Sequence, residues 1–186
     1  MVSLMDLWLP IVLSAVIVFI ASSIIHMVLG FHKSDYKVLP GEDKIAAAMR
    51  EEGVSPGYYT LPHCVDPKEM GKPEMLEKYN QGPVAFVTVT ANGPPVMSKF
   101  LGLWFAFAVV ISVFAAYLAG RTLGPGAEYL AVFRIAGTAA FLGYAASEPI
   151  ASIWKAQPWG ITIKHVFDGL VYALLTGGVF GWLWPS

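Results

Sequence analysis

The sequence has little charge, and that scarcity restricts its class. Only 13% of the 186 residues are charged, whereas a soluble domain has about 25%. A single cysteine excludes an internal disulfide framework. The formal net charge of −1 argues against a nucleic-acid partner. No phosphate-binding loop, nucleophile elbow or HExxH occurs, so enzymatic activity has no positive support, and we lean toward a non-enzyme.

What the sequence does have is long apolar runs. The first, residues 7–32, has 26 positions without a charged side chain, and roughly 20 are enough to cross a bilayer. The residues before it, MVSLMD, include an acid and no base, so we interpret the run as a retained transmembrane helix rather than a signal peptide. Three further spans are predicted at about 100–120, 129–150 and 161–184.

The segment between the first two spans, 33–98, is polar and predicts a small insert. Residues 41–53 and 73–79 favour short helices, and 83–93 is the best strand candidate because it is rich in β-branched and aromatic residues. We expect this strand to pair with 58–61. The predicted fold is an all-α membrane protein with four transmembrane helices and a small α+β extramembrane insert between helices 1 and 2. The chain is expected to divide into transmembrane helix 1 (1–32), the insert (33–98) and transmembrane helices 2–4 (99–186).

Ionisable side chains within the spans are functional candidates, because placing them in a bilayer is costly. The predicted intramembrane polar cluster consists of Arg134, Glu148, Lys164, Asp168 and Tyr172. On a continuous helix Arg134 and Glu148 would share one face, and Asp168 and Tyr172 could touch at a spacing of four. Glu148 with Lys164 is the expected ion pair. A network that locks the bundle is the first interpretation, and a proton or solute path is the second.

Two histidines are candidate cofactor ligands. His26 and His165 are expected at similar depth on facing helices, which permits axial ligation of haem b or, for a single histidine, of a chlorophyll-type pigment. No haem-attachment motif occurs, and the spacing around His63 and Cys64 matches no zinc pattern, so no metal site is predicted. Gly177 and Gly181 form a GxxxG that permits close helix packing.

The basic residues predict an orientation. More of them flank the insert side of the spans than the terminal side, and basic residues favour the cytoplasm. The prediction is a multi-pass protein of the bacterial inner membrane with a cytoplasmic insert and both termini periplasmic. The insert-side residues are Lys33, Lys37, Lys99, Lys155 and Lys164, and the terminal-side residues are Arg121 and Arg134.

Three stretches carry a family resemblance: FHKSDYKVLPGEDKIAAAMR, KFLGLWF and VFDGLVYALLTGGVFGWLWP. With them the chain resembles a group of small four-span bacterial inner-membrane proteins of unknown function. The resemblance implies the four-span architecture and no activity. Small proteins of this build also serve as accessory subunits of energy-converting assemblies, photosynthetic complexes among them, which is an analogy of architecture alone.

The leading hypothesis is therefore a non-catalytic accessory or scaffolding subunit of a larger bacterial membrane complex, either photosynthetic or respiratory. Its expected partners are membrane lipid and other membrane protein subunits. One alternative is a haem- or pigment-binding redox protein that uses His26 and His165. The other is a small transporter, which would need to oligomerise because four helices enclose little pathway.

Overall fold

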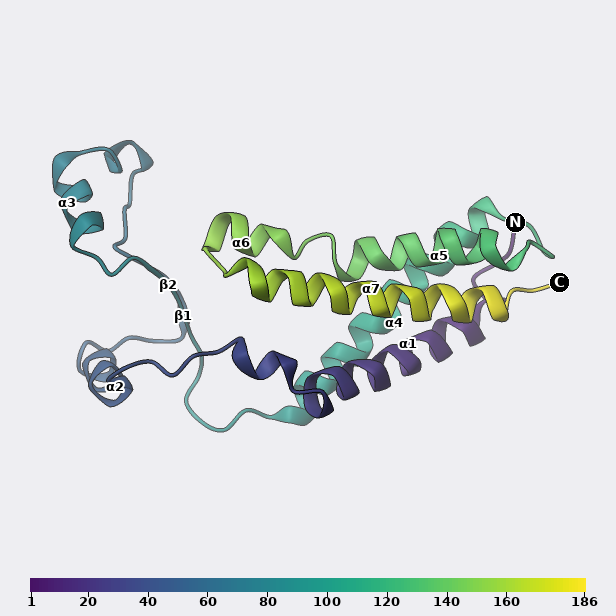
Figure 1. Cartoon of the computed structure of the whole chain (residues 1–186), viewed down its shortest axis with the longest axis horizontal. Helices are drawn as coiled ribbons and strands as arrows, with labels where there is room; N and C mark the ends of the chain where they lie inside the picture. Colours follow the sequence, from purple (N-terminus) through teal and green to yellow (C-terminus); the bar gives the residue numbers. More distant parts are fainter. The chain divides into compact units, whose positions relative to one another are not determined.

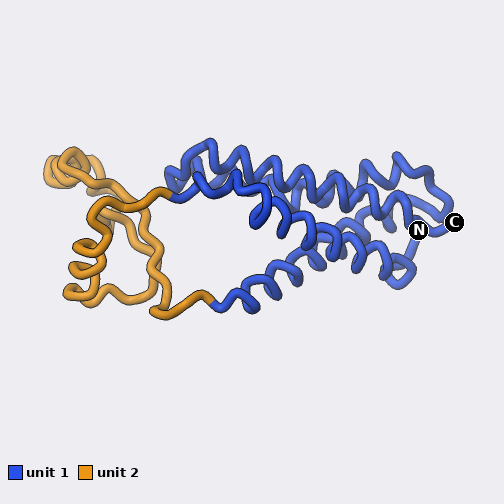
Figure 2. Tube along the Cα trace, turned by 60° about the horizontal axis from the view of Figure 1, so that its bottom comes forward, with its two compact units in different colours: residues 1–36, 96–186 blue, residues 37–95 orange.

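The computed structural model describes all residues, 1–186, and divides the chain into two compact units (Figure 2). Unit 1 combines Met1–Tyr36 with Val96–Ser186 and contains the long helices. Unit 2 is the insert, Lys37–Pro95.

Unit 1 is a bundle of long helices, in which each packs against the one before it in the chain (Figure 1). The last helix returns to the first and closes the bundle, so both termini lie at the same end. Four segments are long and apolar enough to cross a membrane, which confirms the four predicted spans and fits a multi-pass integral membrane protein. The helices are α1 (Trp8–Ser23), α4 (Met97–Thr122), α5 (Tyr129–Tyr144), α6 (Pro149–Lys155) and α7 (Trp159–Trp182).

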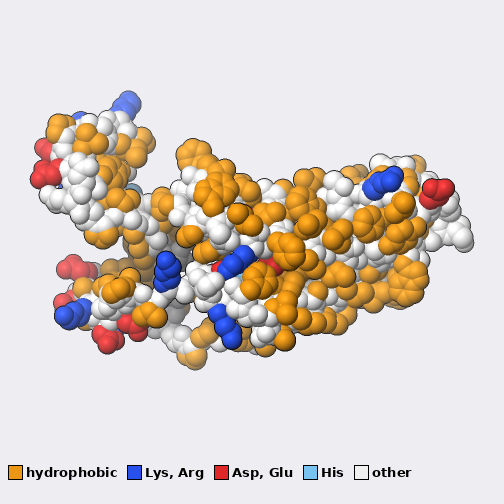
Figure 3. Space-filling model, viewed as in Figure 1, with side chains coloured by type: hydrophobic (Ala, Val, Ile, Leu, Met, Phe, Trp, Pro, Cys, Tyr) orange, Lys and Arg blue, Asp and Glu red, His pale blue; other side chains and the backbone are white.

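Small residues dominate the interior of the bundle, whereas large apolar side chains cover its outer face (Figure 3). Small side chains let helix backbones approach closely, which is how helices associate in lipid. Hydrogen bonds add to this packing: Ser14 Oγ lies 3.0 Å from Ser112 Oγ, and Trp104 Nε1 donates to Ser22 Oγ at 2.8 Å. Fully buried alanines lie on all of the first three spans: Ala15, Ala108, Ala115, Ala116, Ala119, Ala136 and Ala140.

Gly177 and Gly181 lie where α7 meets α5. A Cβ at Gly177 would stand 2.9 Å from the carbonyl oxygen of Phe133 and 3.1 Å from the Cα of Gly137. A Cβ at Gly181 would stand 2.7 Å from the ring of Tyr129. The GxxxG motif therefore allows α7 to pack closely against α5 within the bundle.

The third span differs from the single continuous helix expected over 129–150. Helix α5 ends at Tyr144, and α6 begins only at Pro149. The proline has no N–H to continue the backbone ladder, so the two helices meet at a break. The expectation that Arg134 and Glu148 share one face assumed a continuous helix, and the structure interrupts that helix between them.

Unit 2 contains a two-stranded antiparallel sheet and short helices, as the sequence predicts. Tyr59 pairs with Val87, and Leu61 with Ala85, which confirms the predicted strand partners. No residue of Lys37–Pro95 is buried. The elements are α2 (Glu42–Glu51), β1 (Gly57–Leu61), η3 (Pro67–Glu69), α3 (Pro73–Gln81) and β2 (Ala85–Val89).

Candidate functional site

The end of the first span departs from regular helix, and this departure positions two histidines. Helix α1 continues into a π-helical turn, η1 (Ile24–Val28), and a 3₁₀ turn follows, η2 (Phe31–Ser34). Between them Gly30 has φ +66°, a left-handed conformation that glycine adopts without a steric penalty. In an uninterrupted helix, His26 and His32 would be about 9 Å apart along the axis. Here their rings stack with centroids 4.3 Å apart.

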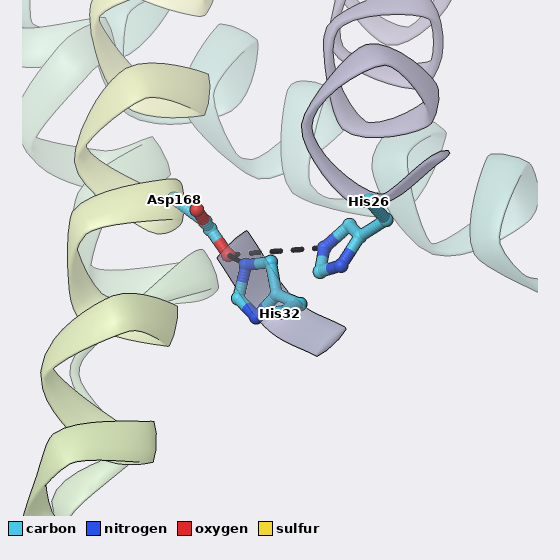
Figure 4. Close-up of side chains that lie close together, drawn as sticks. All are labelled: His26, His32 and Asp168. Carbon is cyan, nitrogen blue, oxygen red and sulfur yellow. Dashed lines mark ion pairs between the residues drawn. The ribbon is translucent and has the colours of Figure 1, made fainter. Parts of the chain in front are cut away.

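Both histidines approach Asp168 of α7, so three separate elements meet at one carboxylate (Figure 4). His32 Nε2 lies 2.9 Å from Asp168 Oδ2, and His26 Nε2 lies 3.7 Å from the same oxygen. The Asp168 side chain is only 4% exposed and that of His32 10%, whereas that of His26 is 46% exposed. The cluster therefore has one buried member, Asp168, one partly buried member, His32, and one exposed member, His26.

The other side of His32 is held by an ion pair. Asp35 Oδ2 lies 2.6 Å from His32 Nδ1, and Asp35 Oδ1 accepts from Lys164 Nζ at 2.5 Å. Lys164 also donates to the carbonyl oxygen of Phe31 at 2.7 Å and to Ser34 Oγ at 2.9 Å. The hydrogen bond from Lys164, more than the weaker contribution of His32, lowers the pKa of the Asp35 carboxyl. Asp35 is thus an ionised acceptor that orients His32.

The atoms between His32 and Asp168 lack hydrogen-bond partners. Although His32 Nε2 and Asp168 Oδ2 are 2.9 Å apart, the contact lacks the geometry of a hydrogen bond. Consequently His32 Nε2 and both carboxylate oxygens of Asp168 are buried without a hydrogen-bond partner. Such orphaned atoms are costly, and native proteins normally provide each with a partner.

A cavity of about 250 Å³ opens beside the cluster. Its polar wall includes His26 and Asp168 together with His165, whose Nδ1 lies 3.0 Å from Glu148 Oε2. Its apolar wall is aromatic, with neighbouring ring centroids 5.5–6.2 Å apart. The aromatic residues are Trp104, Phe107, Tyr144 and Tyr172. The cluster is therefore next to a space that can admit a small ligand or water.

The structure divides the predicted polar cluster. Lys164 pairs with Asp35, and Glu148 with His165, so the expected Glu148–Lys164 ion pair is not formed. The Tyr172 hydroxyl is buried without a hydrogen-bond partner, so it does not bond to Asp168. Arg134 is exposed on α5, away from these groups, and has no ion pair.

The predicted cofactor ligands His26 and His165 both line the cavity, and a haem or pigment there stays a prediction. The ring of His32 lies near both, with centroids 4.3 Å from His26 and 5.6 Å from His165. Sequence reasoning singled out neither His32 nor Asp35. The available signal was Gly30 at the end of the apolar run, since glycine commonly ends helices and lets the chain turn back.

Comparison with protein families, with curated proteins and with solved structures finds no match. The chemistry of the site therefore rests on its own residues. Imidazole nitrogens and a carboxylate at this spacing can share a proton or hold a cation.

Proposed function

We propose that this chain is a non-catalytic subunit of a larger membrane complex, in which the insert contacts a neighbouring protein. Its four apolar helices fit an integral membrane protein. One observation carries the proposal: the insert has an apolar sheet face but buries none of its own residues.

That sheet face follows from the strand register. Residues opposite each other in an antiparallel pair lie on the same face. The pairs Tyr59–Val87 and Leu61–Ala85 therefore share a face, which Val89 extends. Leu61 is 50% exposed. A two-stranded sheet is marginally stable in water by itself, and burying this face against a partner would stabilise it.

The charge of the insert favours a protein over a bilayer surface as that partner. Residues 37–95 carry six Lys or Arg and eight Asp or Glu, a net charge of −2. Anionic lipid headgroups attract basic segments, and they would repel this one. An apolar strand face in a segment of mixed charge suits the apolar core and polar rim of a protein interface.

The test uses a charge on each face of β1. Membranes from the native cell are extracted in mild detergent, and the mass of the complex is read on a native gel. We expect the wild-type chain to migrate with other subunits. Leu61→Glu should release it, because the substitution puts a carboxylate in the apolar interface. Thr60→Glu is the matched control, since Thr60 is the adjacent residue on the opposite face, and it should leave the complex intact.

Two results would contradict the proposal. In one, the wild-type chain migrates alone or only with copies of itself. In the other, Leu61→Glu and Thr60→Glu have the same effect.

A further inference from the structure

We propose that His26, His32 and Asp168 form a binding site for one divalent first-row transition-metal ion, of the class of Zn²⁺ or Fe²⁺. This inference is independent of the subunit role proposed above. The three residues each offer one ligand atom, and these atoms lie within 4.8 Å of one another. Two imidazoles and one carboxylate are a ligand set that zinc and non-haem iron sites use, with further positions left open.

The distances suit a metal of this size. Metal–ligand bonds of about 2.0–2.1 Å separate neighbouring ligand atoms by about 3.0–3.4 Å. The two observed separations from Asp168 Oδ2, 2.9 Å to His32 and 3.7 Å to His26, lie on either side of that range. His26 is the more exposed member, so a small movement of its ring can close the longer distance.

The contacts on the other side of His32 also favour a cation. Lys164 holds Asp35, and Asp35 Oδ2 in turn is placed to accept the N–H of His32 Nδ1. With Nδ1 as the donor to Asp35, Nε2 is the ring atom that lies 2.9 Å from Asp168 Oδ2, where a cation can bind between the two. A metal ion between them would give both His32 Nε2 and Asp168 Oδ2 a partner. A carboxylate that orients a ligating histidine through its other nitrogen is the common arrangement around protein-bound metals.

The charge of Asp168 is a further reason to expect a bound cation. Asp168 is almost completely buried, and a buried carboxylate needs a compensating positive charge. Lys164, which holds the far side of the cluster, already pairs with Asp35. A divalent ion would supply the missing charge, and its open coordination positions would face the adjoining cavity, which His26 and Asp168 line.

A second set of ligand-type residues, His32, Asp35 and His165, lies nearby but is the weaker candidate. Asp35 is already paired with Lys164, and His165 with Glu148. The orphaned carboxylate oxygens of Asp168 belong to the first set alone, which is why the ion is assigned there.

The experiment measures metal binding directly. The full chain is purified in detergent without a polyhistidine tag, stripped with a chelator, loaded with Zn²⁺ and freed of excess metal. We expect about one zinc per chain. Co²⁺ loaded in the same way should give visible d–d absorption, which reports its coordination. A wild-type chain that retains no stoichiometric zinc would overturn the proposal.

Four variants locate the ion. His26→Gln changes an exposed side chain, and Asp168→Asn is nearly isosteric, so both proteins should fold. Loss of an outer-shell partner typically lowers metal affinity by about 10–100-fold, and each of these two substitutions should lower zinc affinity by more than that. Asp35→Asn should fall within that about 10–100-fold range, since Asp35 is a positioning residue. His63→Gln lies in the insert, makes the same change as His26→Gln, and should bind zinc as the wild type does.

His165→Gln separates the two ligand sets. If it abolishes zinc binding while His26→Gln does not, the ion belongs to the second set and the proposal is wrong. Full binding by both His26→Gln and Asp168→Asn would refute it as well.

Discussion

At the scale of single residues, Gly30 decides whether the histidine cluster can form. Its φ of +66° turns the chain out of the π-helical segment and back toward α7. That turn brings His32 against Asp168. If α1 continued as a regular helix, it would carry His32 away from Asp168. A side chain at this position would have to adopt the left-handed conformation.

Gly30→Ala should therefore lower the Tm of the protein in detergent. The left-handed conformation costs a non-glycine residue about 1–2 kcal/mol, and we expect a loss of unfolding free energy of that size. Gly102→Ala is the control, because Gly102 lies within α4 with open space around it, so alanine there should not lower the Tm. If the two variants had the same Tm, alanine at position 30 would adopt the left-handed conformation without a measurable cost.

At the scale of elements, the contact between α5 and α7 depends on the absence of side chains. The atoms nearest to a Cβ at Gly177 belong to the backbone of α5, so they cannot move aside as a flexible side chain would. The same α5 ends at Tyr144, and the break before Pro149 turns Glu148 toward His165 rather than along the α5 face.

Gly177→Ala should separate α5 from α7 and destabilise the bundle by about 1–3 kcal/mol, the usual cost of overpacking. Thermal unfolding in detergent would measure it. Gly160→Ala provides the comparison on the same helix, since nothing lies within 4 Å of a Cβ there. A Gly177→Ala protein as stable as the Gly160→Ala protein would mean that the helices tolerate a wider spacing.

At the scale of the whole molecule, the two ends of unit 1 differ in charge. Arg121 lies at the end of the bundle that holds both termini, and the neighbouring connections are tied by Val2 N donating to Gly120 O and Gly126 N to Pro185 O. The opposite ends of the spans carry more basic residues: Lys33, Lys99, Lys155 and Lys164.

The positive-inside rule predicts that the more basic end faces the cytoplasm. A reporter enzyme fused after Ser186 should therefore be active outside the cytoplasm, and one inserted near Gly71 should be active inside. Four spans keep both termini on one side in either orientation, so fusions at Met1 and Ser186 should agree. The reverse pattern of activity would invert the orientation without changing the number of spans.

By itself the sequence determined the four spans, the insert and its strand pair. Long uncharged runs and alternating β-branched residues are local patterns, and a bilayer leaves an apolar run few choices besides a helix. The same local reasoning identified ionisable side chains within the spans as functional candidates: His26, Glu148, Lys164, His165 and Asp168.

Only the tertiary structure decided which partner each of these residues meets. Spacing along one helix predicts neighbours on that helix, but it does not say which side chain another element will bring. Lys164 meets Asp35 and Glu148 meets His165 because a glycine turn and a proline break redirect the backbone. His32 reaches Asp168 for the same reason, and that contact, made between segments more than 130 residues apart, creates the candidate metal site.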